Sequence, residues 1–413
     1  MSSHVSATAS TPAPIAVVGI GADGWPGLDD HRRRVLTGAA TVVGGPRQLT
    51  LLPDDVGARR TPLPRPLRDR LPALLEQAAA PVVVLASGDP LLSGIGSTLL
   101  DLLGPDAVEV LPHLSSVTLA RARMGWRAED VAVVSAVGRP LHPVLREIHP
   151  DARIVVLSAD SGTPAALAAL LTRHGHGNAA MTVLADLGGA ELRLDGTPGA
   201  WPDVTVPDLN LVCLHGFSTG SSTTPGLPDE AYEHDGQLTK RELRAAALAR
   251  LGPRTGELLW DLGAGAGSIA IEWCRQHPHN RAVAVESDPE RADRISRNAS
   301  RLGVTVSVVT GRTPDALTGL PDPDAVFVGG GLGGEGGAAT LRLARESLRP
   351  GGRLVAHAVT LEGEQSLLAA AGTNGGDLTR ISVERALPLG RWTGWTPARP
   401  VVQWALDVPR EGF

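Results

Sequence analysis

The stretch from Leu258 to Gly267 constrains the fold of this 413-residue chain more than any other. An apolar strand ending at Leu262 runs directly into three alternate glycines, Gly263, Gly265 and Gly267, and a helix-like segment follows. Glycine permits the backbone angles of a tight turn and lets a ligand lie against bare backbone at the strand end. The pattern predicts a strand–turn–helix unit of an open α/β sheet with a small-molecule site at its edge.

A second strand, Arg281 to Glu286, delivers a carboxylate to the same edge, 19 residues after Gly267. That carboxylate can accept hydrogen bonds from ribose hydroxyls. A dinucleotide-binding turn places a glycine three positions after its second one, whereas here Gly265 is followed by Gly267 and Ser268. The spacing therefore favours S-adenosylmethionine, which has no pyrophosphate to hold. An NAD-dependent oxidoreductase is the alternative.

Composition narrows the class of protein. The hydrophobic fraction of 42% and the charged fraction of 20% are ordinary for a globular protein of two or three domains. A net charge of −6 argues against nucleic-acid binding, and no apolar run reaches the roughly 20 residues that span a membrane. Lys240 is the single lysine, so the basic side chains are almost all arginine, which suits carboxylate or phosphate ligands.

Cysteine usage and the N-terminal residues indicate a cytoplasmic protein. Cys213 and Cys274 lie in apolar settings, which predicts neither a disulfide framework nor a metal site. Residues 1–14 are rich in Ser, Thr, Ala and Pro and lack the basic and apolar regions of a signal peptide, so we expect a flexible leader.

Two alternating β/α halves are predicted, at 15–215 and 237–413, joined by a Gly/Ser/Thr/Pro-rich linker over 216–236 that we expect not to pack into a core. In the first half, strands are predicted at 15–21, 41–45, 81–87, 108–112, 131–138, 153–159, 180–187 and 209–214. In the second half, they are predicted at 257–262, 281–286, 305–309, 325–328, 353–358, 381–389 and 401–408. The last two have no helix between them and predict an antiparallel hairpin at the sheet edge.

The second half contains further candidate residues around the first glycine turn. Thr239, with Glu242 three positions on, either forms a helix capping box or borders the cofactor. Asp261 is placed to meet the methionine amino group, and Thr313 lies in a loop that could border the adenine. The predicted cofactor contacts of this half are Thr239, Asp261, Gly263, Ala264, Gly265, Ala266, Gly267, Glu286 and Thr313. A second glycine turn, Gly329, Gly330 and Gly331, follows the fourth strand, where substrate would meet cofactor; a merely flexible loop is the alternative.

The first half has three loops that each follow an apolar strand. They read Val17-Val-Gly-Ile-Gly-Ala-Asp-Gly24, Ser87-Gly-Asp-Pro-Leu-Leu-Ser-Gly-Ile-Gly96 and Leu111-Pro-His-Leu-Ser-Ser-Val117. Backbone amides and short side chains at strand ends can hold a polar small molecule. The candidate cofactor contacts here are Gly19, Gly21, Gly88, Asp89, Ser115 and Ser116, and ordinary turns are the alternative.

These loops, in this order, resemble the tetrapyrrole (corrin/porphyrin) methylase family. The second-half motifs LTKRELR, DLGAGAGSIAIEW, AVAVE and FVGGG are similar to Rossmann-like class I methyltransferases of the precorrin decarboxylating branch. The resemblance implies a two-lobed N-terminal tetrapyrrole-methylase fold followed by a Rossmann-like domain with a mostly parallel sheet. It covers about residues 14–408 and implies one S-adenosylmethionine per domain.

The fused order implies an enzyme of cobalamin biosynthesis. By this resemblance the chain methylates precorrin-6Y at carbons 5 and 15 and removes the ring C acetate carboxyl to give precorrin-8X, with carbon 15 and the decarboxylation assigned to the second half. A homo-oligomer is expected. Two departures stand out: Val137 occupies the position of a family histidine, and Arg312 that of an acidic residue. The absence of the family histidine at Val137 leaves open that only the second half is catalytically active.

Methyl transfer from a sulfonium needs no dedicated nucleophile, so no catalytic residue is assigned from the sequence. Arginine suits bidentate pairing with the carboxylates of a tetrapyrrole. We single out Arg139 and Arg391, beside Arg121 and Arg123, as candidates, with solvated surface groups as the alternative. The tryptophans at 392, 395 and 404 either wall a flat ligand or form a hairpin core, and His357 is either a proton donor or a structural histidine.

Overall fold

The computed structural model describes residues 14–220 and 222–409. Its contacts divide the chain into two units. Unit 1 contains the residues up to Leu141 together with His149–Thr219, and unit 2 contains His142–Ile148 and the residues from Gly220 onward. The α/β class predicted from the sequence is confirmed in both. No helix within the described ranges has the length and hydropathy to cross a bilayer.

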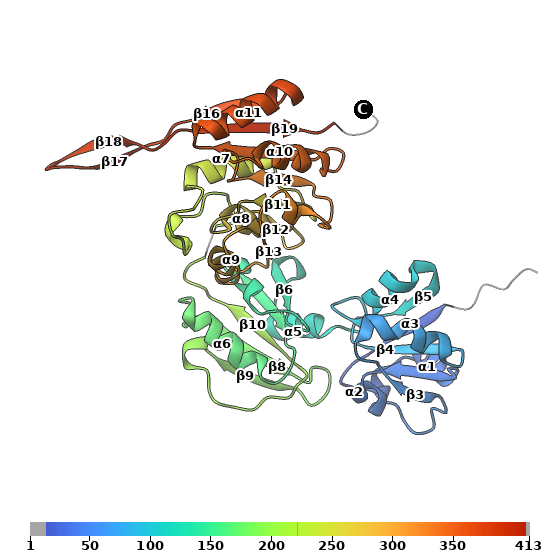
Figure 1. The fold of residues 1–413 in the computed structure, drawn as a ribbon. Helices are drawn as coiled ribbons and strands as arrows, with labels where there is room; N and C mark the ends of the chain where they lie inside the picture. The colour runs from blue at the N-terminus through green and yellow to red at the C-terminus, as the bar shows by residue number, and fades with distance from the viewer. Residues whose placement is uncertain (1–13, 221, 410–413) are drawn as a thin grey trace, which may run out of the picture. The chain divides into compact units, whose positions relative to one another are not determined.

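The first lobe of unit 1 is a five-stranded parallel sheet in the order β3-β2-β4-β1-β5 (Figure 1). Its strands are β1 Ile15–Ile20, β2 Thr41–Gly44, β3 Arg59–Pro62, β4 Val82–Ser87 and β5 Val108–Leu111. Its helices are α1 Asp30–Thr37, α2 Pro46–Thr50, α3 Leu67–Gln77 and α4 Ile95–Leu103. Alternate residues of β1 enter separate buried clusters on the two faces, so helices cover both sides of the sheet, as parallel pairing requires.

The second lobe is a mixed sheet in the order β6-β7-β10-β8-β9, in which only the β6–β7 pair is parallel. Its strands are β6 Val131–Ser135, β7 Arg153–Leu157, β8 Ala180–Ala185, β9 Leu192–Gly196 and β10 Asn210–His215. Its helices are α5 Ser116–Met124 and α6 Thr163–Arg173. Val117 and Ala120 of α5 pack into a core cluster with side chains from β7, β8 and β10.

Unit 2 is built on a seven-stranded sheet in the order β13-β12-β11-β14-β15-β19-β16. Its strands are β11 Leu258–Leu262, β12 Arg281–Glu286, β13 Ser307–Thr310, β14 Ala325–Val328, β15 Arg353–Ala358, β16 Asp377–Ile381 and β19 Val401–Asp407. The first five are parallel, and β19 runs antiparallel between β15 and β16. The prediction of a mostly parallel sheet closed by an antiparallel strand is confirmed.

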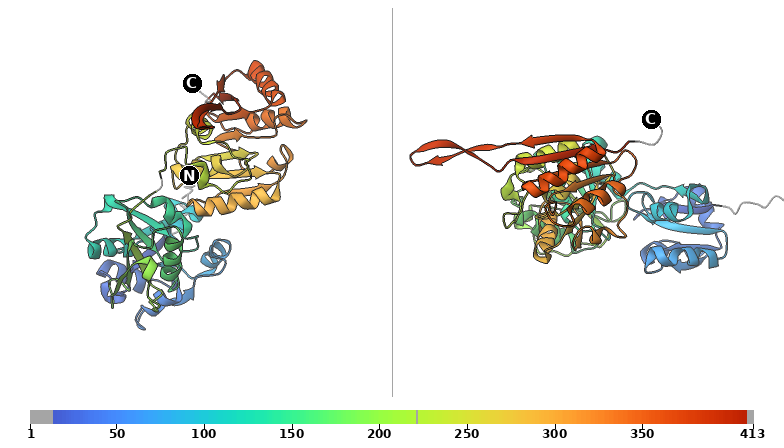
Figure 2. Two further views of the ribbon diagram at one scale, coloured as in Figure 1. Left: turned by 90° about the vertical axis from the view of Figure 1, so that its left-hand side faces the viewer. Right: turned by 45° about the horizontal axis from the view of Figure 1, so that its top comes forward.

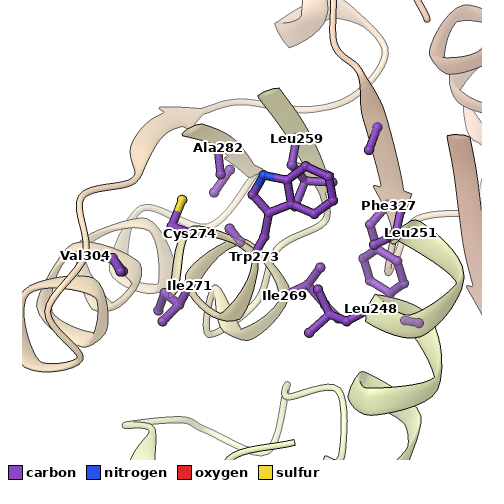
Figure 3. Close-up of a cluster of buried hydrophobic side chains, with 14 of the residues drawn as sticks. Leu248, Leu251, Leu259, Ile269, Ile271, Trp273, Cys274, Ala282, Val304 and Phe327 are labelled. Atoms are coloured by element: carbon purple, nitrogen blue, oxygen red, sulfur yellow. The ribbon is translucent and has the colours of Figure 1, made fainter. Parts of the chain in front are cut away.

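Five helices cover the two faces of this sheet. They are α7 Arg241–Leu251, α8 Ser268–Gln276, α9 Pro289–Arg301, α10 Gly337–Glu346 and α11 Leu361–Asn374. Trp273 of α8 is fully buried in the cluster shared with α7 and α9, where Figure 3 shows its indole among apolar side chains that include Leu259. Burial of such large side chains contributes about 25 cal/mol per Å² of apolar surface, so this face anchors β11.

Three local predictions were wrong. The edge strands β3 and β9 were missed because their residues are polar or merely alternate, which is how half-exposed edges look in a sequence. The single strand predicted over 381–389 is two: β16 ends at Ile381, and β17, Glu384–Leu389, pairs with β18, Trp392–Pro397, in a separate hairpin.

Part of the predicted linker is packed. Leu227 and Tyr232 are buried in the α7/α8/α9 face of unit 2. The carboxylate of Glu272 on α8 accepts hydrogen bonds from the backbone N–H of Gly226 at 2.6 Å and of Leu227 at 3.0 Å, and from the Tyr232 hydroxyl at 2.8 Å. A buried acid on a distant helix orders this stretch, which composition alone could not reveal.

Candidate cofactor and substrate sites

The turn after β11 exposes backbone at the carboxyl edge of the unit 2 sheet. Gly263, Gly265 and Gly267 have φ values of +69°, +58° and +76°. A Cβ on Gly265 would lie 2.8 Å from the carbonyl oxygen of Gln237, and one on Gly267 would lie 2.6 Å from Cγ2 of Ile295. Side chains are therefore excluded both by backbone conformation and by space.

Glu286 closes the other side of this turn. The side chain is 5% exposed; Oε2 accepts from the backbone N–H of Gly265 at 2.8 Å, and Oε1 accepts from that of Asp288 at 3.1 Å. A carboxylate has about four lone-pair positions. Two backbone donors thus orient the group, and acceptor capacity remains for the hydroxyls of a ribose.

Asp261 lies beneath the turn and is 1% exposed. Its Oδ2 accepts from the backbone N–H of Ala270 in α8 at 3.0 Å. Burial raises the pKa of Asp261 to about 7, with a hydrogen bond from Ala270 opposing the shift and the nearby charge of Glu286 adding to it. A cationic ligand group at this edge would favour the ionised form.

Asp261 makes the stability of unit 2 depend on pH. Because the folded pKa lies above the ordinary aspartate value of 3.8, the folded state holds an additional proton between about pH 4 and about pH 7. The free energy of unfolding contributed by this group therefore falls as pH rises through that window. An Asp261→Asn variant keeps an acceptor for Ala270 without the titration. Thermal unfolding without ligand should show the variant gaining melting temperature relative to the wild type up to about pH 7 and then levelling; a constant difference would contradict the assignment.

The second glycine turn lies against the first. The Gly329 N–H donates to the carbonyl of Leu262 at 2.8 Å, and a Cβ on Gly263 would be 3.0 Å from the backbone nitrogen of Gly330. Gly331 has a φ of +80°. The turn is thus held by the end of β11, and it is not merely a flexible loop.

A pocket of about 430 Å³ opens at this edge of unit 2. Gly263, Ala264, Gly265 and Gly329 line it, together with His357 at the end of β15. Charged side chains complete the wall: Lys240, Glu242, Arg385 and Arg399. Arg385 donates to Glu242 at 2.5 Å and the Lys240 ammonium lies 3.6 Å from Asp229, whereas Arg399 forms no ion pair within the described residues.

The capping box predicted at Thr239 is not formed. Helix α7 begins at Arg241, and its N-cap is Lys240, without a side-chain cap. Thr239 instead lines the pocket, and the Glu242 carboxylate binds Arg385. The helix thus begins one residue later than the Ser/Thr-x-x-Glu pattern indicates, and the Thr239 carbonyl accepts a hydrogen bond from Arg244.

In unit 1, backbone hydrogen bonds join the three candidate loops. The Gly88 N–H donates to the carbonyl of Ile20 at 3.0 Å, and the His113 N–H donates to the carbonyl of Gly88 at 3.2 Å. A Cβ on Gly19 would lie 2.0 Å from the Gly88 oxygen, so only glycine permits this approach. Three strand ends far apart in sequence therefore form one edge.

A smaller pocket, of about 70 Å³, lies between the lobes of unit 1. Gly21, Gly88 and Ser116 line it. Ser115 instead caps α5 by accepting from Thr118 N–H at 3.0 Å, and Asp89 accepts from Leu91 N–H at 2.9 Å. Their side chains therefore hold the loops in shape.

Sequence reasoning missed Arg47 and Asn210, which also line this pocket. Arg47 Nη2 donates to the Ser87 hydroxyl at 2.9 Å, and burial lowers the pKa of Arg47, an effect that the charge of Asp186 opposes. The Gly45-Pro46-Arg47 turn directly after β2 was the available signal.

Comparisons with known proteins agree with both units. Residues 14–194 match the family of tetrapyrrole (corrin/porphyrin) methylases, and residues 230–408 match a precorrin methyltransferase domain. The chain is 47% identical over 398 residues to the precorrin-6Y C(5,15)-methyltransferase (decarboxylating) of Mycobacterium tuberculosis H37Rv, covering 95% of this chain and 99% of that protein. The chain belongs to this methyltransferase family.

Two other proteins each match less than half of the chain. A probable cobalt-precorrin-6B C(15)-methyltransferase (decarboxylating) of Pyrobaculum calidifontis is 39% identical over 185 residues, which is 43% of this chain and 93% of that protein. The crystal structure of the C-terminal domain of precorrin-6Y C5,15-methyltransferase from Rhodobacter capsulatus is 44% identical, covers 45% of this chain and all of that chain, and superposes with a TM-score of 0.42.

Membership of the precorrin-6Y methyltransferase family makes the protein an S-adenosylmethionine-dependent enzyme and excludes the NAD-dependent oxidoreductase. Several predicted contacts nevertheless lie outside the two pocket walls. Ala266 is buried, Gly267 is the N-cap of α8 against Ile295 of α9, and Thr313 lies in the loop after β13, next to the exposed Arg312. Their roles toward a ligand stay predictions.

The predicted substrate arginines do not line either pocket. Arg139 is exposed after β6, near the exposed Val137, and Arg123 forms a bidentate pair with Glu191 at 2.7 Å. Arg391 lies in the hairpin, over the ring of Trp392. Trp404 is fully buried in the sheet, whereas Trp392 and Trp395 are exposed in the hairpin, so the predicted hairpin core is wrong. A ligand wall formed by the two exposed rings stays a prediction.

Proposed function

We propose that the two units divide the reaction of the precorrin-6Y methyltransferase family between them. The enzyme methylates precorrin-6Y at carbons 5 and 15 and removes the ring C acetate carboxyl to give precorrin-8X. Unit 2 handles carbon 15 and the decarboxylation, and unit 1 handles carbon 5. The observation that carries this division is the unit 2 pocket, which joins a bare glycine turn to arginine and lysine side chains. A relative that matches 43% of this chain, named a probable cobalt-precorrin-6B C(15)-methyltransferase (decarboxylating), supports a separate carbon 15 unit.

Each unit would hold its own S-adenosylmethionine. The residues present fit such a group in unit 2, because the glycine turn leaves no room for a Cβ and Glu286 retains acceptor capacity beside it. Glu286 would accept from the ribose hydroxyls, and Asp261 would meet the amino group. In unit 1, the cofactor would be bound by the pocket residues Gly21, Gly88 and Ser116. The cofactor supplies an electrophilic methyl group.

The protein's contribution is positioning and charge. An electron-rich ring carbon attacks the methyl directly, so alignment of the reacting atoms at about 3 Å in a site that excludes water provides most of the several kcal/mol of catalysis. Arg399, Arg385 and Lys240 supply cations that match the carboxylates of a reduced tetrapyrrole.

Product masses test the division. Incubation of the full chain with precorrin-6Y and S-adenosylmethionine should give a product that has gained two CH₂ units and lost one CO₂. A product with a single methyl and no CO₂ loss would contradict the role of unit 2, and a product with one methyl and CO₂ loss would contradict that of unit 1.

We also propose that the enzyme is a homo-oligomer, held by the β17–β18 hairpin. Figures 1 and 2 show this hairpin extending away from the sheet of unit 2. Its apolar side chains are widely exposed: Leu389 and Trp392 at 68% each, and Trp395 at 73%. Exposed aromatic groups of this kind mark protein contacts. The buried, free thiols of Cys213 and Cys274 support the proposed cytoplasmic location.

Replacing both hairpin tryptophans, Trp392→Ser with Trp395→Ser, should convert the oligomer to monomers in sedimentation velocity. The circular dichroism of the double variant should match that of the wild type, since neither ring packs in the core of the single chain. A wild-type protein that sediments as a monomer, or a double variant that keeps its oligomeric state, would exclude this contact.

A further inference from the structure

His357 projects from the sheet of unit 2 into the pocket wall. Residues alternate across a strand, so it shares a face with Val355, which packs in the α7/α8/α9 core. His357 comes two residues later, near the carboxyl end of β15, where it lines the pocket with Gly263 and Gly329. It is 7% exposed. The strand thus places the imidazole of His357 at the edge of the sheet where both glycine turns lie.

A cross-strand partner fixes the orientation of this ring. His357 pairs with Gln403 of β19 in the antiparallel ladder, and its Nε2 donates to Gln403 Oε1 at 2.9 Å. Gln403 is 3% exposed, and the Phe327 ring packs edge-on with its centroid 5.1 Å away. Nδ1 has no hydrogen-bond partner among residues 14–220 and 222–409. It is therefore the nitrogen left for a ligand.

The positive charges around the pocket favour the neutral form of the His357 imidazole, and they also favour binding of the substrate's carboxylates. Lys240, Arg385 and Arg399 are cationic, and the single acid of the wall, Glu242, is bound to Arg385. Burial lowers the pKa of His357, an effect that the Gln403 hydrogen bond opposes. Once protonated, this imidazole would be a strong acid, whereas lysine and arginine side chains are poor proton donors near neutral pH.

We propose that His357 is the catalytic proton donor of the decarboxylation and that Gln403 is its positioning residue; this rests on the proposed function of unit 2. When the acetate C–C bond breaks, its electron pair passes to the CH₂ carbon and the conjugated ring, and CO₂ leaves. That carbon takes a proton from Nδ1 and becomes a methyl group. Nδ1 of the neutral ring obtains this proton beforehand, when carbon 15 exchanges its hydrogen for a methyl and releases a proton, so protons balance within one turnover.

A His357→Asn variant tests the donor. CO₂ can recombine with the carbanion until the carbon is protonated, so net CO₂ release should slow by roughly 100-fold. The ratio of CO₂ released to carbon 15 methyl added should fall below that of the wild type, while the affinity for S-adenosylhomocysteine is kept. A His279→Asn variant, on an exposed loop, should match the wild type. Equal rates in the His357 variant and the wild type would overturn the inference.

Gln403→Leu tests the positioning residue without relying on turnover. Imidazole ¹H–¹⁵N spectra of the free enzyme should show His357 neutral, with the proton on Nε2, near pH 7; the variant should lose this single tautomer and shift the pH profile of CO₂ release. An Nδ1-protonated ring in the wild type would overturn the inference. A wild type that neither methylates nor decarboxylates would instead refute the proposed function itself.

Discussion

A Gly265→Val variant should lose methylation of carbon 15 and CO₂ release while it still methylates carbon 5. The valine Cβ would stand 2.8 Å from the Gln237 carbonyl oxygen at a backbone φ of +58°. The turn must then move, and the N–H that orients Glu286 moves with it. We expect the affinity of unit 2 for S-adenosylhomocysteine to fall by at least roughly 100-fold, or about 3 kcal/mol.

Gly252→Val is the matched control for this variant. Gly252 has a similar φ of +54° at the end of α7, and no atom lies within 4 Å of the position of a Cβ. The control therefore carries the same backbone strain away from the pocket. Loss of carbon 15 methylation in both variants would show that strain, and not the turn, is responsible, and loss of carbon 5 methylation in the Gly265 variant would contradict separate sites.

We expect the second large effect from a Glu272→Ala variant, which should lower the stability of unit 2. Glu272 Oε1 accepts from Nε of Arg244 at 2.5 Å, and both side chains are buried. The same carboxylate binds two backbone N–H groups and the Tyr232 hydroxyl. Removing it leaves the buried Arg244 guanidinium with only the longer 3.3 Å pair to Asp229 and leaves the two backbone N–H groups unbonded, which costs about 3–5 kcal/mol. The melting temperature of unit 2 should fall by roughly 10 °C.

Glu346→Ala serves as the comparison, because its ion pair with Arg342 on α10 is exposed. Such a pair contributes at most about 1 kcal/mol. Differential scanning calorimetry of the full chain should show a lower melting temperature for one transition only in the Glu272 variant. The Glu346 variant should show almost no change in melting temperature. Equal losses of melting temperature in the Glu272 and Glu346 variants would mean that the buried network does not hold residues 226–232 in place.

The site residues that could be predicted from the sequence lie close together along the chain. The strand, the glycine turn and the acid of Glu286 follow each other within one β/α/β unit, so their spacing alone places them at one edge. The pocket cations could not be found that way. Lys240 precedes the sheet, whereas Arg385 lies in β17 and Arg399 follows β18, so only the folded chain brings the three cations to one pocket.

The error in the strand predicted over 381–389 has the same origin. The apolar alternation over 381–389 continues through the point where β16 ends, so the pattern does not show that β17 and β18 leave the sheet. Arg391 lies in this hairpin, over Trp392 and outside the pocket wall, and its role toward substrate stays a prediction. His357 was visible as a strand-end histidine, but its orientation depends on Gln403, which is 46 residues away.

The central claim is that one chain holds two independent S-adenosylmethionine sites, and titration calorimetry tests it most directly. Two equivalents of S-adenosylhomocysteine should bind per wild-type chain, and one should bind per Gly265→Val chain. Saturation of the wild type at a single equivalent would contradict the account.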